Sequence, residues 1–128
     1  MNGHFYEICT EKKAKILCEI QPPAIPGDNP TVTLTPVGQV VNEMTAKIPG
    51  IDKYVVMPNH VHMIIHVTGG KNVSQTIRTW KSFITKKIGK PIWQNSFYDH
   101  IIRDERDYLV KWKYIDDNPV KWNQDEYN

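Results

Sequence analysis

The stretch that decides the fold is residues 51–67, which reads IDKYVVMPNHVHMIIHV. Two runs rich in apolar and β-branched residues, 51–57 and 61–67, lie on either side of Pro58 and Asn59. Proline and asparagine are typical of tight turns, whereas the flanking runs favour extended strands. The pattern therefore predicts an antiparallel hairpin.

Two histidines of this hairpin have the spacing of a metal-binding pair. His60 and His62 are two residues apart, so in a strand they share one face while Val61 and Met63 point to the other. Neutral imidazole is a good ligand for divalent transition ions. An isolated pair of this kind is more often two surface histidines, so a third ligand is needed. His66 is in phase but one strand step further along.

A helix is expected from about residue 104 to residue 117, before Asn118 and Pro119. Apolar side chains at one-, three- and four-residue steps predict its buried face. These residues are Tyr108, Leu109, Trp112 and Ile115. The phase of Tyr108 directs this side chain toward the core.

Another tyrosine of the same helix has a different environment. Tyr114 and Asn118 are four residues apart and stack on a common side, and Lys111 precedes Tyr114 by three residues. A metal held by two histidines and the amide oxygen would polarise a phosphate while the phenol attacks. Alone, the pattern is more often a half-exposed tyrosine, so only its combination with the histidine pair favours a nucleophile.

The rest of the chain predicts an α+β fold. Strands are expected at 4–10 and, as its weaker partner, at 14–20, followed by a loop with five proline or glycine residues. Thr35 and Pro36 predict the start of a first helix, which ends near Gly50.

Further along, Ser74 is expected to cap a second helix. Residues 92–103 are expected to form a long aromatic strand. The resulting order, ββαββαβα, predicts an antiparallel sheet with helices mainly on one face, nearest to the ferredoxin-like architecture. We expect a single domain over residues 1–128.

Composition excludes several classes of protein. The chain has 128 residues, of which 40% are hydrophobic and 23% charged, so disordered and fibrous classes do not fit. No stretch approaches the roughly 18 apolar residues of a membrane span, and the start lacks a signal-peptide pattern, which predicts a cytoplasmic protein without a membrane partner. Cys9 and Cys18 lack the spacing of a structural zinc site. A net charge of +2 is compatible with a polyanionic partner without requiring one.

Taken together, these residues resemble the single-tyrosine HUH transposases of bacterial insertion sequences, including the REP-associated tyrosine transposases. The resemblance rests on three blocks in the family's order: YVVMPNHVHMIIHV at 54–67, IWQNSFYDHIIRDERDY at 92–108 and YIDDNPVKW at 114–122. The blocks cover the C-terminal part of the chain.

The resemblance implies an HUH fold in which a helix presents Tyr114 to the sheet that carries His60 and His62. It further implies that Asn118 is a third metal ligand and that the ion is Mg²⁺ or Mn²⁺. The implied activity is metal-dependent cutting and rejoining of DNA through a 5′-phosphotyrosine and a free 3′-hydroxyl, without ATP. Tyr108 remains the rival nucleophile.

The implied partner is single-stranded or hairpin DNA, which needs cations for phosphates and flat rings for unstacked bases. Candidate cations are Arg78, Lys81 and Lys111, and candidate rings are Trp93, Phe97 and Tyr98, although a core role suits at least two of the rings better. The sequence leaves monomer and homodimer open.

Two other functions remain open at this point. The first is a hairpin or single-strand binding module that has lost cleavage. The second is a hydrolase in which the histidine pair holds a metal and water attacks, a reaction that would survive Tyr114→Phe.

Overall fold

The computed structural model describes residues 3–67 and 72–122. Four strands form one antiparallel sheet in the order β4-β5-β1-β6. Their bounds are β1 Gly3–Cys9, β4 Ile51–Val56, β5 His60–His66 and β6 Tyr98–Ile102. The predicted hairpin is confirmed, because β4 and β5 pair directly, from Val56 opposite Val61 to Ile51 opposite Ile65.

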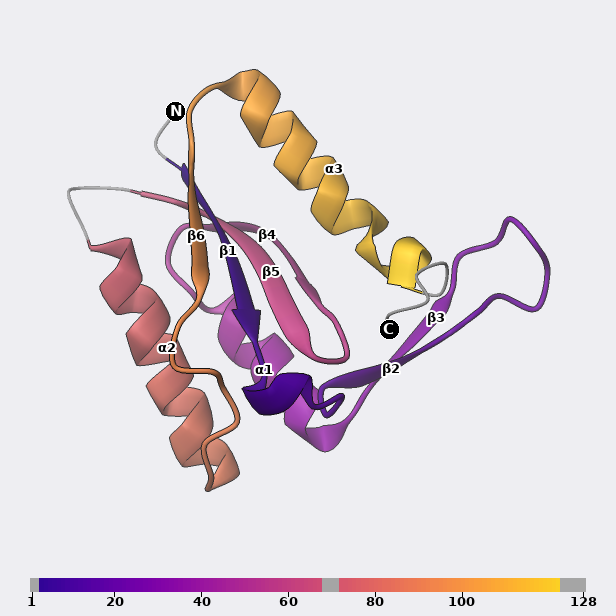
Figure 1. The fold of residues 1–128 in the computed structure, drawn as a ribbon, viewed down its shortest axis with the longest axis horizontal. Helices are drawn as coiled ribbons and strands as arrows, with labels where there is room; N and C mark the ends of the chain where they lie inside the picture. The colour runs from indigo at the N-terminus through magenta and orange to yellow at the C-terminus, as the bar shows by residue number, and fades with distance from the viewer. Residues whose placement is uncertain (1–2, 68–71, 123–128) are drawn as a thin grey trace.

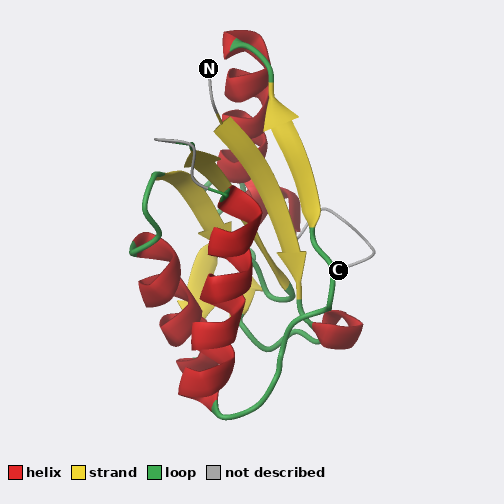
Figure 2. Cartoon of the chain, turned by 90° about the vertical axis from the view of Figure 1, so that its left-hand side faces the viewer, coloured by secondary structure: helices red, strands yellow, loops and turns green. Residues whose placement is uncertain are grey.

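Helices cover both faces of this sheet. Their bounds are α1 Pro36–Ala46, α2 Val73–Ile88 and α3 Glu105–Trp122. Helices α1 and α2 lie together on one face, and α3 runs across the other from the end of β6 (Figures 1 and 2). The α+β class with helices mainly on one face is therefore confirmed for two of the three helices. No helix of the described chain is long and apolar enough to cross a membrane.

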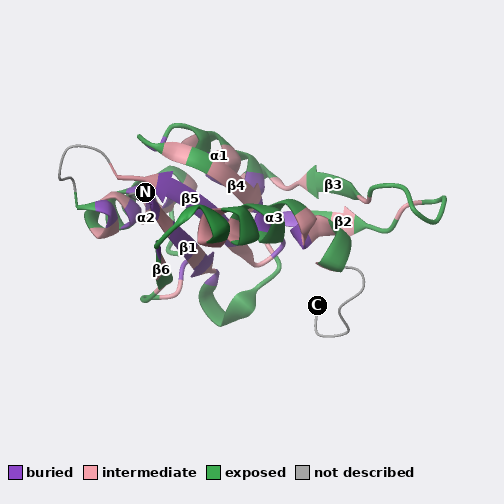
Figure 3. Ribbon diagram, turned by 90° about the horizontal axis from the view of Figure 1, so that it is seen from above, coloured by how far each residue is buried: buried purple, intermediate pink, exposed green. Residues whose placement is uncertain are grey.

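Alternation along β5 divides the interior into two apolar cores. Val61 and Met63 point into the larger core, which α1 and α2 close with side chains such as Val41 and Trp80. The smaller core lies under α3 and consists of Phe5, Ile64, Ile102 and Ile115. Both central strands, β1 and β5, are consequently buried (Figure 3).

The segment expected to pair with the first strand does not do so. Strand β2 (Cys18–Gln21) pairs with β3 (Thr31–Leu34), which was not predicted, and the two form a separate ribbon that extends away from the body (Figure 1). Both edges of β1 are already paired, with β5 and β6. The proline-rich loop instead closes a local hairpin.

Two other predicted elements differ in their bounds. Helix α2 is capped by Asn72, whose side chain accepts a hydrogen bond from Gln75 N, so Ser74 is not the cap. The long strand expected at 92–103 shrinks to β6. Trp93 still forms an isolated β-bridge with Thr10, and its ring packs against Trp80 in the larger core, with centroids 4.9 Å apart. The chain then bends at Asn95, before β6 begins.

The last helix differs from the prediction in its buried face and its end. Leu109 and Trp112 are 56% and 36% exposed, whereas Ile115 and Asn118 are buried. The helix also continues past Asn118 and Pro119 to Trp122. The predicted apolar face was therefore rotated, because docking on the sheet selects the face that carries Ile115.

Candidate active site

Strand β5 presents two histidines to the space under α3. The rings of His60 and His62 have centroids 4.6 Å apart. His60 Nδ1 donates to Asn59 Oδ1 over 2.6 Å, which orients the ring and leaves Nε2 as the unprotonated nitrogen. Burial and then the neighbouring His62 lower the pKa of His60 to about 4, so the imidazole is neutral at physiological pH. Neutral imidazole is the form that binds metal.

Within residues 3–67 and 72–122, His62 has no hydrogen-bond partner for either ring nitrogen, although the side chain is only 1% exposed. Buried polar atoms are normally paired, because leaving one unpaired costs about 1 to 3 kcal/mol. A bound cation would satisfy Nε2, so this unpaired nitrogen is evidence that the residues fit a metal ion.

Glu7 joins the two histidines in a group that could hold a metal ion, and the sequence analysis missed it. Strand β1 pairs with β5 so that Glu7 lies opposite His62, and the carboxylate oxygen is 3.6 Å from His62 Nε2. One ligand atom each of Glu7, His60 and His62 lie within 4.8 Å of one another. Contact with His62 lowers the pKa of Glu7, which keeps the carboxylate charged. The register of β1 against β5 was the missing information.

Helix α3 places Tyr114 over this cluster. The phenol ring lies 5.2 Å from the His62 ring and 6.1 Å from Phe5, measured between centroids, and the residue is 42% exposed. Burial and then the charge of Glu7 raise the pKa of Tyr114, so the resting phenol is protonated. Lys121 Nζ lies 5.8 Å from the centroid of the same ring.

Asn118 lies one turn after Tyr114 and is 8% exposed. Its Nδ2 donates to the carbonyl of Tyr114, which leaves Oδ1 as an acceptor or ligand. A cavity of about 390 Å³ is lined by residues of both groups, among them Glu7, His60, Tyr114, Asn118 and Lys121. Of the residues named from the sequence, His60, Tyr114 and Asn118 therefore line one cavity, and the ring of His62 lies against the rings of His60 and Tyr114.

Comparison with known proteins connects this geometry to a family. No protein-family model matches the chain. An uncharacterised protein of Haemophilus influenzae is 31% identical over 96% of this chain and 83% of its own length. A REP-associated tyrosine transposase of Escherichia coli K12 is 40% identical over 56% of this chain. A solved REP-associated tyrosine transposase bound to a REP hairpin superposes with a TM-score of 0.70 and 26% identity, over 94% of this chain and 67% of that one.

This chain belongs to the REP-associated tyrosine transposase family. A crystal structure of a Deinococcus radiodurans R1 protein, described as a putative transposase, shares the fold. Its TM-score is 0.57, with 13% identity over 90% of this chain and 88% of that one. The segment of this chain that aligns with the E. coli relative spans 44% of that protein's length.

Tyr108 and His66 lie in a different cluster. Tyr108 donates to Asp52 Oδ2 over 2.5 Å, and His66 Nε2 lies 3.2 Å from the same oxygen. The hydrogen bond to Asp52 raises the pKa of Tyr108 to about 12. His66 is not part of the described metal-ligand cluster, and Tyr108 is half-buried on the helix turn before Lys111.

The three candidate DNA-binding cations lie in different places. Arg78 and Lys81 belong to α2, which covers the sheet face opposite Tyr114. Lys81 is half-buried, and its Nζ donates to the carbonyl of Gln94 over 2.6 Å. Lys111 lies on α3, with Nζ 5.6 Å from the ring centroid of Phe5, and is the one of the three beside Tyr114.

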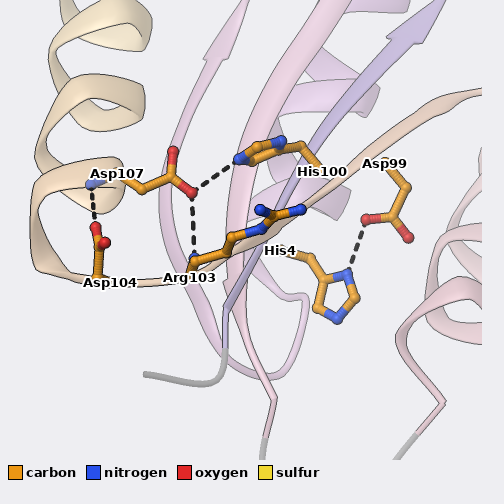
Figure 4. Close-up of polar contacts among 6 residues, drawn as sticks. All are labelled: His4, Asp99, His100, Arg103, Asp104 and Asp107. Carbon is orange, nitrogen blue, oxygen red and sulfur yellow. Dashed lines mark hydrogen bonds and ion pairs between the residues drawn. The ribbon is translucent and has the colours of Figure 1, made fainter.

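A network of polar contacts at the end of β6 anchors the beginning of α3 (Figure 4). Asp107 Oδ2 accepts from His100 Nε2 over 2.8 Å and from the backbone N–H of Arg103 over 3.1 Å. Asp104 caps the helix by accepting from the N–H of Asp107. These contacts set the direction in which α3 leaves β6, and so the position of Tyr114 two turns later.

Proposed function

We propose that this transposase cuts and rejoins single-stranded DNA through attack of Tyr114 on a phosphodiester. The observation that carries the proposal is the place of the Tyr114 ring, 5.2 Å from the His62 ring and in the same cavity as Glu7 and His60. The phenol oxygen forms a bond to phosphorus while the bond from phosphorus to the 3′ oxygen breaks. The phenol proton is released, and the leaving 3′ oxygen gains a proton to become a hydroxyl.

A divalent ion fits the residues around Tyr114. His60, His62 and Glu7 would hold it, with the Asn118 amide oxygen as a fourth group. Two imidazoles favour Mn²⁺, whereas the carboxylate and amide oxygens also suit Mg²⁺. Bound there, the ion would act as a Lewis acid on the scissile phosphate.

The lysines near Tyr114 have a separate role in the proposal. The raised pKa of Tyr114 means that the phenol keeps its proton until the substrate is bound. Lys121, near the ring, and Lys111, over Phe5, place positive charge where the phosphate approaches. The 5′-phosphotyrosine conserves the energy of the phosphoester, so the free 3′-hydroxyl can reverse the reaction and rejoin DNA without ATP.

Hairpin DNA with an unpaired flank is the proposed substrate. A solved relative is described as bound to a REP hairpin, and it shares a fold with this chain over nearly all of the chain's length. We further propose that residues 1–128 act as a single catalytic domain.

The test follows the two ends of a cut hairpin oligonucleotide in the presence of Mn²⁺ or Mg²⁺. With a 3′ label, denaturing gels should show a labelled protein adduct, because the 5′-phosphotyrosine retains the 3′ fragment. With a 5′ label, they should show a shorter oligonucleotide that ends in a 3′-hydroxyl. Tyr114→Phe should abolish both products, and Tyr108→Phe, the matched control on the same helix, should retain them.

Other outcomes separate the alternatives. Loss in Tyr108→Phe alone would assign the nucleophile to Tyr108. Cleavage that never yields an adduct and survives Tyr114→Phe would indicate a water-dependent hydrolase. Binding without cleavage, over several hairpins and metals, would indicate a DNA-binding module.

A further inference from the structure

A second cavity, of about 270 Å³, adjoins the active site. It shares Glu7, Cys9 and Lys13 with the cavity that contains Tyr114. Beyond these shared residues it is lined by Gln94, Ser96, Phe97 and Tyr98. The two cavities therefore adjoin at these shared residues, and Tyr114 lines the first cavity while the segment before β6 lines the second.

That segment is held firmly although it has no regular secondary structure. The N–H of Gln94 donates to the carbonyl of Cys9 over 3.0 Å, and the carbonyl of Ile92 accepts from the N–H of Glu11 over 2.8 Å. On its other side, Lys81 Nζ donates to the carbonyl of Gln94. The backbone of the cavity wall is thus already ordered, so binding a ligand there costs little conformational entropy.

Two aromatic rings end this segment. Phe97 packs edge-on against Tyr6 with centroids 5.6 Å apart, as part of the larger core. Tyr98 packs edge-on against Phe5, 6.3 Å away, and is 48% exposed. A ring supported from behind and open in front is the kind of surface on which an unstacked base packs.

Lys13 stands where the two cavities meet. Its backbone φ is +53°, and that of Lys12 is +55°, values that residues with a Cβ rarely adopt. Consecutive strained residues of this kind persist where the surroundings require them and often lie at functional sites. Here the strained turn places a cationic side chain in the wall that both cavities share.

We propose that the second cavity is a subsite for one unpaired nucleotide of the DNA substrate, adjacent to the scissile phosphate. The base stacks on Tyr98, while the Gln94 amide and the Ser96 hydroxyl meet its edge. Lys13 binds the backbone phosphate between this nucleotide and the cleaved bond. The inference rests on the proposed function, since it identifies part of the substrate that reaches Tyr114.

The test combines protein variants with DNA variants in a double-mutant cycle, in EDTA so that binding is measured without cleavage. Fluorescence anisotropy would follow a labelled hairpin whose unpaired flank carries a single abasic site, moved one position at a time. In the wild type, one position should weaken binding by roughly tenfold, the scale of one lost base–aromatic stack. Tyr98→Ala should weaken binding of the intact DNA by a similar factor and show no further loss at that position.

Controls separate loss of the ring from loss of the fold. Tyr98→Leu keeps an apolar contact on Phe5 and should behave like Tyr98→Ala. Phe83→Ala removes another exposed ring, which lies on α2 and lines neither of the two cavities. This variant should bind like the wild type. Lys13→Gln should weaken binding of all the oligonucleotides, whereas Lys12→Gln, which carries the same backbone strain outside both cavities, should not.

The subsite would be overturned if the affinity lost by Tyr98→Ala added to the affinity lost at every abasic position. It would also be overturned if Tyr98→Ala bound the intact DNA like the wild type. Because the cycle contains no metal, it is independent of the adduct assay. Coupling in the cycle without any Tyr114 adduct would leave the subsite standing and reject the proposed reaction. An adduct without coupling would do the reverse.

Discussion

Glu7 lies beside His62 because two strands pair, although 55 positions separate the two residues in the chain. Directly opposite residues of an antiparallel pair have Cβ atoms about 4.5 to 5.5 Å apart. A carboxylate beside the two imidazoles offers a charged oxygen ligand and offsets the charge of a divalent ion. The donor set therefore combines nitrogen and oxygen ligands.

Glu7→Gln should weaken Mn²⁺ binding by at least about tenfold, because the amide keeps the shape of the side chain but removes its charge. Isothermal titration calorimetry without DNA would measure the affinity. Asp52→Asn removes a carboxylate that contacts Tyr108 and His66 instead, and should bind Mn²⁺ like the wild type. Equal affinities for Glu7→Gln and the wild type would exclude Glu7 as a ligand.

Asp107 should make stability depend on acid pH. The hydrogen bond from His100, followed by that from the backbone of Arg103, lowers the pKa of Asp107. A carboxyl whose pKa is lowered in the folded protein contributes its full stabilisation at pH values above its pKa in the unfolded chain, about 3.9. This contribution disappears as the pH falls through the folded pKa. At a pH near 5, urea unfolding should therefore give the wild type a higher free energy of unfolding than Asp107→Asn. The difference should be under about 1 kcal/mol, since the pair is near the surface.

As the pH falls through the folded pKa of Asp107, the two unfolding free energies should converge. Asp28→Asn, in the exposed loop after β2, is the control and should follow the wild type throughout. A difference that widens as the pH falls would show that Asp107 does not act through its charge.

Helix α3 docks through a face that its hydrophobic residues do not identify. Large apolar side chains occur on two of its sides, and the buried side carries Ile115 and Asn118. On the exposed side, Lys53 Nζ lies over the Trp112 ring, 3.9 Å from its centroid. Lys53 also forms an ion pair with Asp116 over 2.8 Å. The helix is thus oriented by a small core beneath it and by cation contacts at its edge.

Ile115→Ala should lower the free energy of unfolding by about 2 to 5 kcal/mol, because it opens a cavity between α3 and the sheet. Leu109→Ala, which removes a side chain of similar size that is 56% exposed, should change it by less than about 0.5 kcal/mol. Chemical denaturation followed by circular dichroism measures both. Equal effects would mean that α3 rotates on the sheet in solution.

The two faces of the sheet differ in what they carry: one bears most of the apolar core, and the other bears the candidate site. The larger core, under α1 and α2, contains most of the buried apolar side chains, whereas the ligand cluster and Tyr114 lie on the face covered by α3. The ribbon of β2 and β3 belongs to neither core beyond its base and extends outward (Figures 1 and 3). Residues 24–29 at its tip are all exposed.

Replacing residues 22–29 with a short glycine-containing turn should leave the thermal midpoint within about 3 °C of the wild type, since loop length alters stability only slowly. Tyr114 adduct formation should also be unchanged. Differential scanning calorimetry and the 3′-label assay measure the two effects. A large fall in the midpoint would show that the tip packs on the body, and loss of the adduct alone would show that it contacts the DNA.

Local spacing in the sequence determined the hairpin, the shared face of His60 and His62, and the stacking of Asn118 on Tyr114. These features depend on strand and helix periods over a few residues. Tertiary structure alone decided that Glu7 joins the histidines, that Ile115 rather than Leu109 faces the sheet, and that β2 pairs with β3 instead of β1. The physical reason is that strand register and helix docking depend on which apolar surfaces bury each other across the whole chain, and no short window contains both partners.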